Sequence, residues 1–184
     1  MGKEILKQFL HFLGLFFISL AIVLPIRQFI IQPFLVRGES MAPNFSNFDY
    51  LFVERVSYHF RQPERGEVIV FRFPQNKSDF YIKRIIGLPA EEIMVKEGRV
   101  DVKTREGKRL SLIEPYLRSG TFIEGSFYMR LGEDEYYVLG DNRNASFDSR
   151  RWGVLPGKYI IGKVLVRIWP PTKARAFWGE EFEY

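Results

Sequence analysis

The sequence predicts an all-β fold of antiparallel sheets, preceded by one transmembrane α-helix. Two observations support this prediction. Residues 8–26, near the N-terminus, form a run of nineteen positions without a formal charge. Beyond Arg37, short runs rich in β-branched and aromatic residues alternate with Gly, Pro, Asn and Asp, and no long 3.6-residue periodicity is present. The length of 184 residues suits one ordinary domain and an appendage.

The uncharged run is long enough to cross a bilayer. At about 1.5 Å per residue it spans roughly 28 Å, close to the thickness of the hydrocarbon core. We therefore expect a transmembrane helix over about 8–27, within an N-terminal anchor of residues 1–31. The alternative is a cleaved signal peptide, with Lys3 and Lys7 as its basic start and Ser19-Leu20-Ala21 as a small-x-small site. Because residues 22–26 continue the apolar run beyond that site, a retained anchor is favoured.

The remaining residues, 32–184, predict a single β-rich domain. A tight hairpin turn is expected at Glu97-Gly98. Residues 114–120 fit a short helix or a loop, and 170–184 a loosely held tail whose Phe177, Trp178 and Phe182 either dock on the domain or touch lipid. The predicted strands are 50–56, 67–73, 80–86, 93–96, 99–102, 136–139 and 160–169.

Composition excludes several classes of function. The chain has 27 Lys and Arg against 22 Asp and Glu, a net charge of +5. Residues 1–37 carry four basic residues and one acidic residue, so most of the excess flanks the apolar run and does not form a nucleic-acid patch. The absence of Cys removes thiol nucleophiles, Cys-ligated zinc and iron–sulfur clusters. With only two His, a Ser-His-Asp triad is hard to assemble, so a hydrolase of this sequence would use another base.

Three stretches are richer in polar and charged residues than packing requires. Gly38-Glu39-Ser40-Met41-Ala42-Pro43 has the composition of a turn. In Tyr81-Ile82-Lys83-Arg84-Ile85-Ile86-Gly87-Leu88-Pro89, two cations interrupt an apolar strand, so alternation turns one of them inward; an edge strand protected by Lys is the alternative. Gly140-Asp141-Asn142-Arg143-Asn144-Ala145-Ser146-Phe147-Asp148-Ser149-Arg150 follows a predicted strand and also fits a polar surface loop.

Together, in this order and behind an apolar segment, these stretches resemble the type I signal peptidases, membrane-anchored Ser-Lys proteases that release exported proteins. The resemblance also includes the strand Arg65-Gly66-Glu67-Val68-Ile69-Val70-Phe71 and spans most of residues 1–168. It implies the Ser-Lys peptidase fold, and cleavage of signal peptides after small-x-small sites, typically Ala-x-Ala.

The resemblance implies Ser40 as the nucleophile and Lys83 as its general base, with Ser146 orienting the lysine amine. A lysine has an ordinary pKa near 10.4, so a lysine base must be desolvated or lie near another cation, and the apolar neighbours of Lys83 and the adjacent Arg84 could provide this. The expected oxyanion donor is the Ser40 backbone N–H. A second donor, which some relatives supply from a serine hydroxyl, is in doubt because Gly38 occupies that position.

Supporting and substrate-binding residues also follow from the resemblance. Two ion pairs are expected to brace the site, Arg84 with Asp141 and Arg150 with Asp148. Asn44 and Ala90-Glu91 depart from the usual Thr and Gly-Asp, and we expect neither change to abolish activity. The substrate pocket is expected to be lined by Phe34, Val36, Met41, Tyr81 and Ile82.

The resemblance requires no metal and no cofactor. It implies preprotein signal peptides, the lipid bilayer and the secretion translocon as partners, and a catalytic domain on the extracytoplasmic side of the plasma membrane. A self-cleaving repressor would carry a DNA-binding domain where this chain has an apolar segment. The presence of Ser40, Lys83 and Ser146 together argues against an inactive tethered β-domain, and the absence of Cys excludes a sortase-like transpeptidase.

Overall fold

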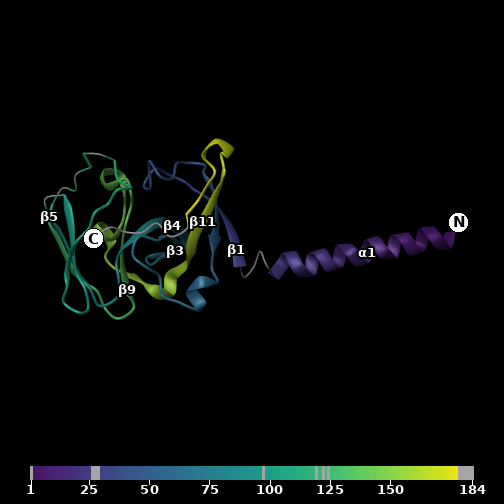
Figure 1. Cartoon of the computed structure of the whole chain (residues 1–184), viewed down its shortest axis with the longest axis horizontal. Coiled ribbons are helices and arrows are strands. Elements are labelled where there is room, and N and C mark those ends of the chain that lie inside the picture. The colour runs from purple at the N-terminus through teal and green to yellow at the C-terminus, as the bar shows by residue number, and fades with distance from the viewer. Residues whose placement is uncertain are drawn as a thin grey trace.

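The computed structural model describes residues 2–25, 30–96, 98–118, 120–121, 123 and 125–177 of the chain. The N-terminal helix α1 (Gly2–Pro25) projects away from a β-rich domain (Figure 1). It begins six residues before the predicted span because Lys3, Glu4 and Lys7 are good helix formers. The segment Lys3–Leu24 has a mean hydropathy of 1.9 and none of its length is buried, which is consistent with a membrane anchor. Arg27, at the predicted end of the span, lies outside the described residues.

The predicted all-β fold is confirmed, and in the described residues every strand pairing is antiparallel. The larger sheet has the order β1-β2-β11-β3-β4-β9-β10, with β12 paired to β11. Its strands are β1 (Ile31–Leu35), β2 (Tyr50–Glu54), β3 (Val68–Phe73), β4 (Asn76–Gly87), β9 (Glu135–Leu139), β10 (Leu155–Pro156), β11 (Ile160–Trp169) and β12 (Arg175–Ala176).

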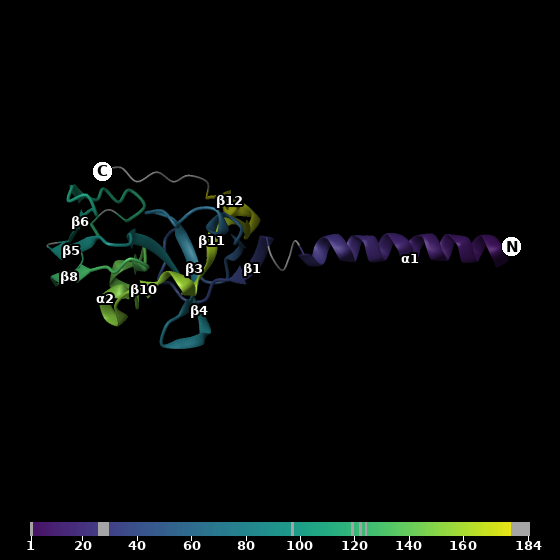
Figure 2. The same cartoon turned by 90° about the horizontal axis from the view of Figure 1, so that it is seen from below.

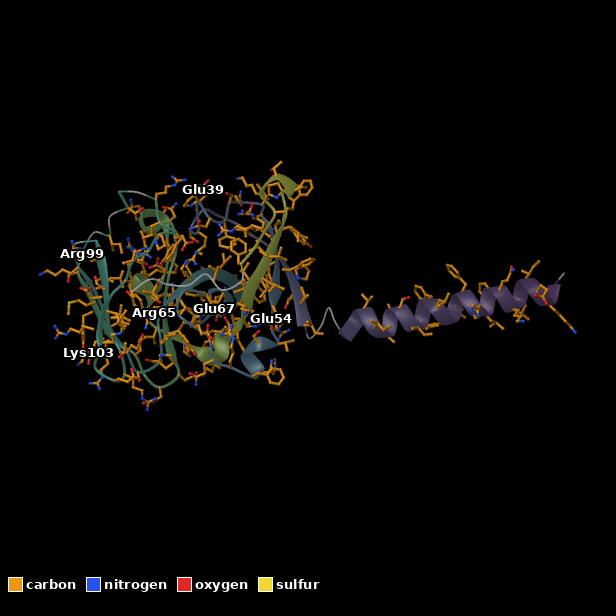
Figure 3. The ribbon with its side chains drawn as sticks, in the orientation of Figure 1. Glu39, Glu54, Arg65, Glu67, Arg99 and Lys103 are labelled. Carbon is orange, nitrogen blue, oxygen red and sulfur yellow. The ribbon has the colours of Figure 1, made fainter. Side chains whose placement is uncertain are left out.

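A smaller sheet lies at the end of the domain farthest from α1 (Figure 2). Arg99 and Lys103 project from it there (Figure 3). Its order is β7-β6-β5-β8, and its strands are β5 (Glu92–Lys96), β6 (Arg99–Lys103), β7 (Arg109–Ser111) and β8 (Phe127–Arg130). Short helical turns occur at α2 (Ser149–Trp152) and at Ser57–His59, Arg143–Ala145, Gly157–Tyr159 and Pro171–Lys173.

The apolar strands of the larger sheet are buried on both faces. In β3, Val68 and Val70 belong to one core cluster, and Ile69 and Phe71 belong to another on the opposite face. A third cluster lies between the sheets and includes Ile86 of β4 and Ile93 of β5. A strand covered on both faces favours a continuous apolar run, as the sequence of β3 shows.

The larger sheet is strongly curled. Three strands separate β1 from β4 in the hydrogen-bonded order, so a flat sheet would hold them roughly 19 Å apart. Yet the rings of Phe34 on β1 and Phe80 on β4 have centroids only 5.6 Å apart. The curl therefore brings β1 and β4 together as the two walls of a groove.

All seven predicted strands are present, with ends that differ by up to four residues. Five others were missed, namely β1, β7, β8, β10 and β12, because strands of two to five residues are too short for their alternation to stand out. The turn between β5 and β6 agrees with the pairing of Lys96 with Arg99 and the φ of +78° at Gly98, whereas Glu97 lies outside the described residues. The described part of 114–120 is a loop with turns rather than a helix.

The sequence predicts a loosely held tail over 170–184. For residues 170–177, the part that the structure describes, this prediction is wrong. β12 pairs with β11, and the ring of Phe177 packs against Phe45 at a centroid distance of 4.7 Å. Phe177 therefore docks on the domain, because its ring fills a gap beside the buried Phe45. Trp178 and Phe182 lie outside the described residues.

Candidate active site

Ser40 lies in a series of turns that connects β1 to β2. Met41 and Phe45, which follow it, are 1% and 0% exposed and anchor the turns in the core. The Phe45 N–H donates to the Met41 carbonyl oxygen at 2.9 Å, and the Gly38 N–H donates to Asn47 Oδ1 at 3.1 Å. Gly38 has a φ of +90°, a conformation that favours glycine. The turn predicted from composition is therefore present, and it presents Ser40 to the groove.

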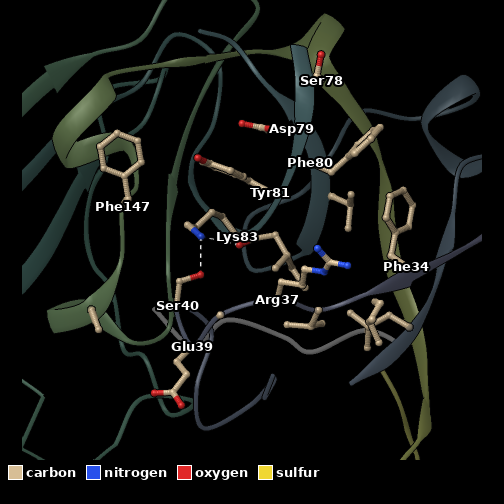
Figure 4. A pocket seen from close by; sticks show the side chains of 17 residues that line it. Phe34, Arg37, Glu39, Ser40, Ser78, Asp79, Phe80, Tyr81, Lys83 and Phe147 are labelled. Atoms are coloured by element: carbon tan, nitrogen blue, oxygen red, sulfur yellow. Dashed lines mark hydrogen bonds between the residues drawn. The ribbon is translucent and has the colours of Figure 1, made fainter. Parts of the chain in front are cut away.

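Lys83 reaches Ser40 from the middle of β4. Its side-chain Nζ donates a 2.7 Å hydrogen bond to Ser40 Oγ and a 2.9 Å hydrogen bond to the Ile82 carbonyl oxygen (Figure 4). Lys83 is 4% exposed. Two side chains 43 positions apart in the chain thus meet in a site that is largely shielded from water.

Burial lowers the pKa of Lys83 from 10.5 to about 8. The cause is desolvation of the ammonium, and the nearby carboxylates of Asp148 and Asp141 oppose it by raising the pKa. At a pKa of about 8 a usable fraction of the amine is neutral near pH 7, so Lys83 can accept a proton there. The sequence prediction of a desolvated lysine thus agrees with the geometry.

The predicted contribution of Arg84 to this shift is wrong. Arg84 lies on the opposite face of β4, where its Nε and Nη2 donate to Asp141 at 2.9 and 2.7 Å. Because this carboxylate neutralises the guanidinium, Arg84 does not act on Lys83 as an unpaired cation. Arg84 is also buried, at 2% exposure, so both cations lie in the interior on opposite faces of the strand. From Arg84 onward β4 runs between β3 and β9 and is not an edge strand, whereas residues 76–83 have no strand partner on the β9 side in the described residues.

The loop that follows β9 is hydrogen-bonded to the backbone of the Ser40 turn. The Asn142 N–H donates to the Ser40 carbonyl oxygen at 3.0 Å, and Asn142 Nδ2 donates to the Glu39 carbonyl oxygen at 3.1 Å. The expected pair of Arg150 and Asp148 is formed through two 2.8 Å hydrogen bonds. Asp148 is fully buried and also accepts from the Gly140 N–H at 3.1 Å. These contacts rule out the alternative of a polar surface loop.

The predicted hydrogen bond from Ser146 to Lys83 is not formed in this structure. Ser146 Oγ is buried and has no hydrogen-bond partner among the described residues. It lies against Gly140, beside the Ser40 backbone. The side chain is therefore next to the dyad but is not engaged with the amine, whose hydrogen bonds go to Ser40 and Ile82.

A groove of about 630 Å³ opens beside the dyad, between β1 and the first half of β4 (Figure 4). Four of the five predicted pocket residues line it: Phe34, Val36, Tyr81 and Ile82. The fifth prediction, Met41, is wrong, because its side chain points into the core on the far side of the turn and is 1% exposed. Besides Lys83, the lining includes three charged residues, Arg37, Glu39 and Asp79. It also includes Phe80 and Phe147, which lie on opposite sides of the dyad in Figure 4.

Asn44 and Glu91, which differ from the residues that the resemblance leads us to expect, both form buried or partly buried contacts. Asn44 Nδ2 donates to Asp141 Oδ2 at 2.8 Å and to the Tyr116 carbonyl oxygen at 2.9 Å. Ala90 has a φ of +65°, which is unfavourable for a residue with a β-carbon. Glu91 is buried, pairs with Arg65 at 2.6 Å and accepts from the Leu88 N–H at 2.8 Å.

Sequence reasoning missed Glu114 and Tyr116, which precede β8. Glu114 forms a buried ion pair with Arg143, and the ring of Tyr116 lies 3.9 Å from the Arg84 guanidinium carbon. The only signal in the sequence is a short polar and aromatic stretch in a segment without periodicity. That signal does not distinguish these residues from an ordinary loop, because their partners are distant in the chain.

Comparison with known proteins agrees with this site. Residues 9–169 match the family model described as signal peptidase, peptidase S26. A signal peptidase I of Leptolyngbya laminosa is 39% identical over 163 residues, covering 85% of this chain and 77% of that protein. A signal peptidase IB of Staphylococcus aureus is 35% identical over 187 residues, covering 92% of each. A probable signal peptidase I-2 of Synechocystis is 38% identical, covering 83% and 69%.

Among solved structures, a signal peptidase I from Enterococcus faecalis is similar, with a TM-score of 0.47, 27% identity, and coverage of 56% of this chain and 97% of that one. The family match spans most of the chain, including the Ser40 turn, β4 and the loop after β9. The chain therefore belongs to the type I signal peptidases of the peptidase S26 family, membrane-bound serine peptidases that remove signal peptides from preproteins.

Proposed function

We propose that this chain cleaves preproteins after small-x-small sites with Ser40 as nucleophile and Lys83 as general base. The observation that carries the proposal is the 2.7 Å contact between Lys83 Nζ and Ser40 Oγ at the wall of the groove. A serine hydroxyl becomes an effective nucleophile when an adjacent base accepts its proton. Lys83 is the base within hydrogen-bond reach, and its lowered pKa suits the task.

The reaction follows from this geometry. Neutral Lys83 takes the Ser40 proton while Oγ attacks the scissile carbonyl carbon, and the resulting ammonium then gives that proton to the departing amine. The acyl-enzyme is cleared by a water that Lys83 deprotonates in the same way, and the Ser40 hydroxyl is restored. No step needs a metal or a cofactor.

The oxyanion of each tetrahedral intermediate needs fixed donors. The Ser40 N–H makes no hydrogen bond within the described part of the chain, which leaves it available for this role. Gly38, two residues earlier, supplies no hydroxyl, and its own N–H is engaged by Asn47. Its lack of a side chain instead lets the substrate backbone approach closely. Ser146, whose buried Oγ has no partner in the described residues and lies against Gly140 beside the Ser40 backbone, is assigned to orient the Lys83 amine.

Substrate binds as an added strand along the groove. The edge of β1 away from β2 and the edge of residues 76–83 of β4 away from β3 have no strand partner in the described residues. Main-chain pairing there would hold any extended peptide. Selection for small side chains then comes from the apolar walls formed by Phe34, Val36, Tyr81 and Ile82.

Residues 1–31 act as the membrane anchor, and residues 32–184 as the extracytoplasmic peptidase domain. An apolar row supports contact between this domain and the bilayer. Leu35, Tyr50 and Trp169 are paired side by side across β1, β2 and β11, and they are 45%, 37% and 58% exposed. β1 also lies at the end of the domain nearest α1 (Figure 1). These features support a groove held at the membrane surface, where signal peptides would emerge from the secretion translocon.

The test is cleavage of a preprotein bearing an Ala-x-Ala site by the detergent-solubilised full chain. We expect product at that bond from the wild type, and none from Ser40→Ala or Lys83→Ala. Lys108→Ala is the control, because Lys108 is an exposed lysine in the turn between β6 and β7 and does not line the groove. Cleavage by Lys83→Ala at the wild-type rate would overturn the dyad. A reporter fused at Tyr184 that lies inside the cytoplasm would overturn the proposed topology.

A further inference from the structure

We propose that Glu114 and Tyr116 are positioning residues. They keep Ser40 and Lys83 aligned with each other through contacts with Arg143 and Arg84. Glu114 and Tyr116 both lie in the connection between β7 and β8, which belongs to the smaller sheet. The proposal rests on the assignment of the dyad made above. The connection between β7 and β8 would thus have a role in the reaction, although none of its residues lines the groove.

The first link runs from Glu114 to the loop after β9. The Arg143 guanidinium donates to both oxygens of the Glu114 carboxylate, with Nη1 to Oε2 at 2.9 Å. The two side chains are 1% and 8% exposed. Arg143 Nε then donates to the Gly140 carbonyl oxygen at 3.1 Å. Because Gly140 lies directly against the Ser40 backbone, these hydrogen bonds connect Glu114 to the Ser40 turn through Arg143.

The second link runs from Tyr116 to the strand that carries the base. The ring of Tyr116 covers the Arg84 guanidinium, with 3.9 Å between the Arg84 Cζ and the ring centroid. Arg84 is the next residue after Lys83 and is held by Asp141 on its other side. The Arg84 guanidinium thus lies between an aromatic face and a carboxylate. These contacts restrict the movement of β4 next to Lys83.

The two links are joined. The Tyr116 hydroxyl donates to Glu114, and Arg143 Nη2 donates to the Tyr116 hydroxyl at 3.2 Å. Asn44, four residues after the nucleophile, donates through Nδ2 to both the Tyr116 carbonyl oxygen and Asp141. The Ser40 turn, β4 and the loop after β9 therefore all contact the Glu114–Tyr116 segment.

Such a closed network matters for catalysis because proton transfer and attack tolerate little displacement. A shift of about 1 Å at reacting groups can cost roughly 100-fold in rate. The three segments that carry Ser40, Lys83 and Ser146 lie far apart in sequence, so only tertiary contacts align them. Loosening the shared contact should lower kcat, while the groove walls on β1 and β4 should leave KM nearly unchanged.

The chain offers a matched control for the test. Tyr58, Glu67 and Arg61 repeat the same chemistry: the Tyr58 hydroxyl donates to Glu67 at 2.9 Å, and Arg61 pairs with the same carboxylate. Glu67 lies well away from Glu39, the residue before Ser40, in the view of Figure 3. The variants Tyr116→Phe and Glu114→Gln are therefore compared with Tyr58→Phe and Glu67→Gln in the full chain, each for kcat, KM and Tm.

We expect Tyr116→Phe and Glu114→Gln to lower kcat about tenfold or more with KM within about twofold. The control pair should lower Tm by a similar amount and leave kcat at the wild-type value. Tyr116→Phe retains the ring over Arg84, so it reports on positioning even if Glu114→Gln fails to fold. Wild-type kcat in Tyr116→Phe, or an equal loss of kcat in the controls, would overturn the positioning role alone. Retained cleavage by Ser40→Ala would overturn the dyad assignment itself.

Discussion

Gly140 packs directly against the backbone of Ser40. A β-carbon on Gly140 would lie closer than 3.0 Å to the Ser40 carbonyl oxygen and to Ser146 Oγ, distances that real side chains do not adopt. The glycine is therefore required by the close approach of two loops and not by its own dihedral angles. This contact joins the segment of the nucleophile to the segment that carries Ser146.

Gly140→Ala should consequently displace Ser40 from Lys83. We expect kcat for an Ala-x-Ala preprotein to fall roughly 100-fold, because the Ser40 carbonyl cannot move without moving the nucleophile. Gly14→Ala, in α1, serves as a control, since a β-carbon there would meet nothing within 4 Å and the backbone is helical. A Gly140→Ala enzyme with wild-type kcat would show that the turn can adjust freely.

The activity should depend on pH through the neutral amine of Lys83. The pKa of Lys83 is lowered to about 8 by burial, and the base is competent only when unprotonated. The value of kcat/KM should therefore fall tenfold per unit as the pH decreases below about 8, and level off above it. A profile that is flat between pH 6 and 9 would contradict a lysine base with this pKa.

The same pKa shift predicts a gain in stability when the amine is removed. In the unfolded chain Lys83 has a pKa near 10.5, so below pH 8 the folded state carries a charge that burial disfavours. The unfolded state binds more protons between pH 8 and 10.5, and stability rises with pH across that window. Lys83→Met should raise the free energy of unfolding at pH 7 by on the order of 2 kcal/mol, and by less at pH 11. Urea unfolding at both pH values measures this. A variant that is less stable than the wild type at pH 7 would refute the predicted cost of burial.

Ala90→Gly should stabilise the protein. Ala90 has a φ of +65°, where a β-carbon clashes with the backbone at a cost of about 1–2 kcal/mol, partly offset by the greater freedom of glycine in the unfolded state. We expect a gain of roughly 0.5–1 kcal/mol and a small rise in Tm. Gly107→Ala, at a φ of +85°, should have the opposite sign. Equal Tm values for Ala90→Gly and the wild type would indicate that the loop relaxes.

Trp169→Glu should slow cleavage of membrane-inserted substrates but not of soluble ones. Trp169 ends the apolar row with Tyr50 and Leu35, and a charge there should disfavour contact with the bilayer interface. We expect slower cleavage of a preprotein inserted in vesicles and an unchanged rate on a soluble peptide in detergent. Tyr128→Glu is the control, because Tyr128 is 60% exposed on the smaller sheet. Equal rates on vesicles for Trp169→Glu and the wild type would argue against the proposed orientation.

Much of the larger sheet could be predicted because its signal is local. The strand β11 has the predicted bounds, 160–169, since seven of its ten residues are β-branched, aliphatic or aromatic and Pro170 follows it directly. The two-residue β10 and β12 could not be predicted, because pairing with a neighbour defines them and side-chain pattern does not. The first four residues of β4, 76–79, were missed for the same reason. They are polar or charged, and backbone geometry rather than an apolar side-chain pattern makes them part of the strand.

For the site, the sequence by itself determined which residues are chemically able to act. The absence of Cys excludes a thiol nucleophile and the scarcity of His makes a His base hard to assemble, while the motifs around Ser40, Lys83 and Ser146 resemble one family, which implies the Ser-Lys pair. Only the tertiary structure decided how they meet. It buried both Lys83 and Arg84 on opposite faces of β4, placed Met41 in the core, and brought Glu114 and Tyr116 beneath the site. The physical reason is that desolvation and ion pairing depend on distances between segments far apart in the chain, and these distances arise from the curl and packing of the sheets.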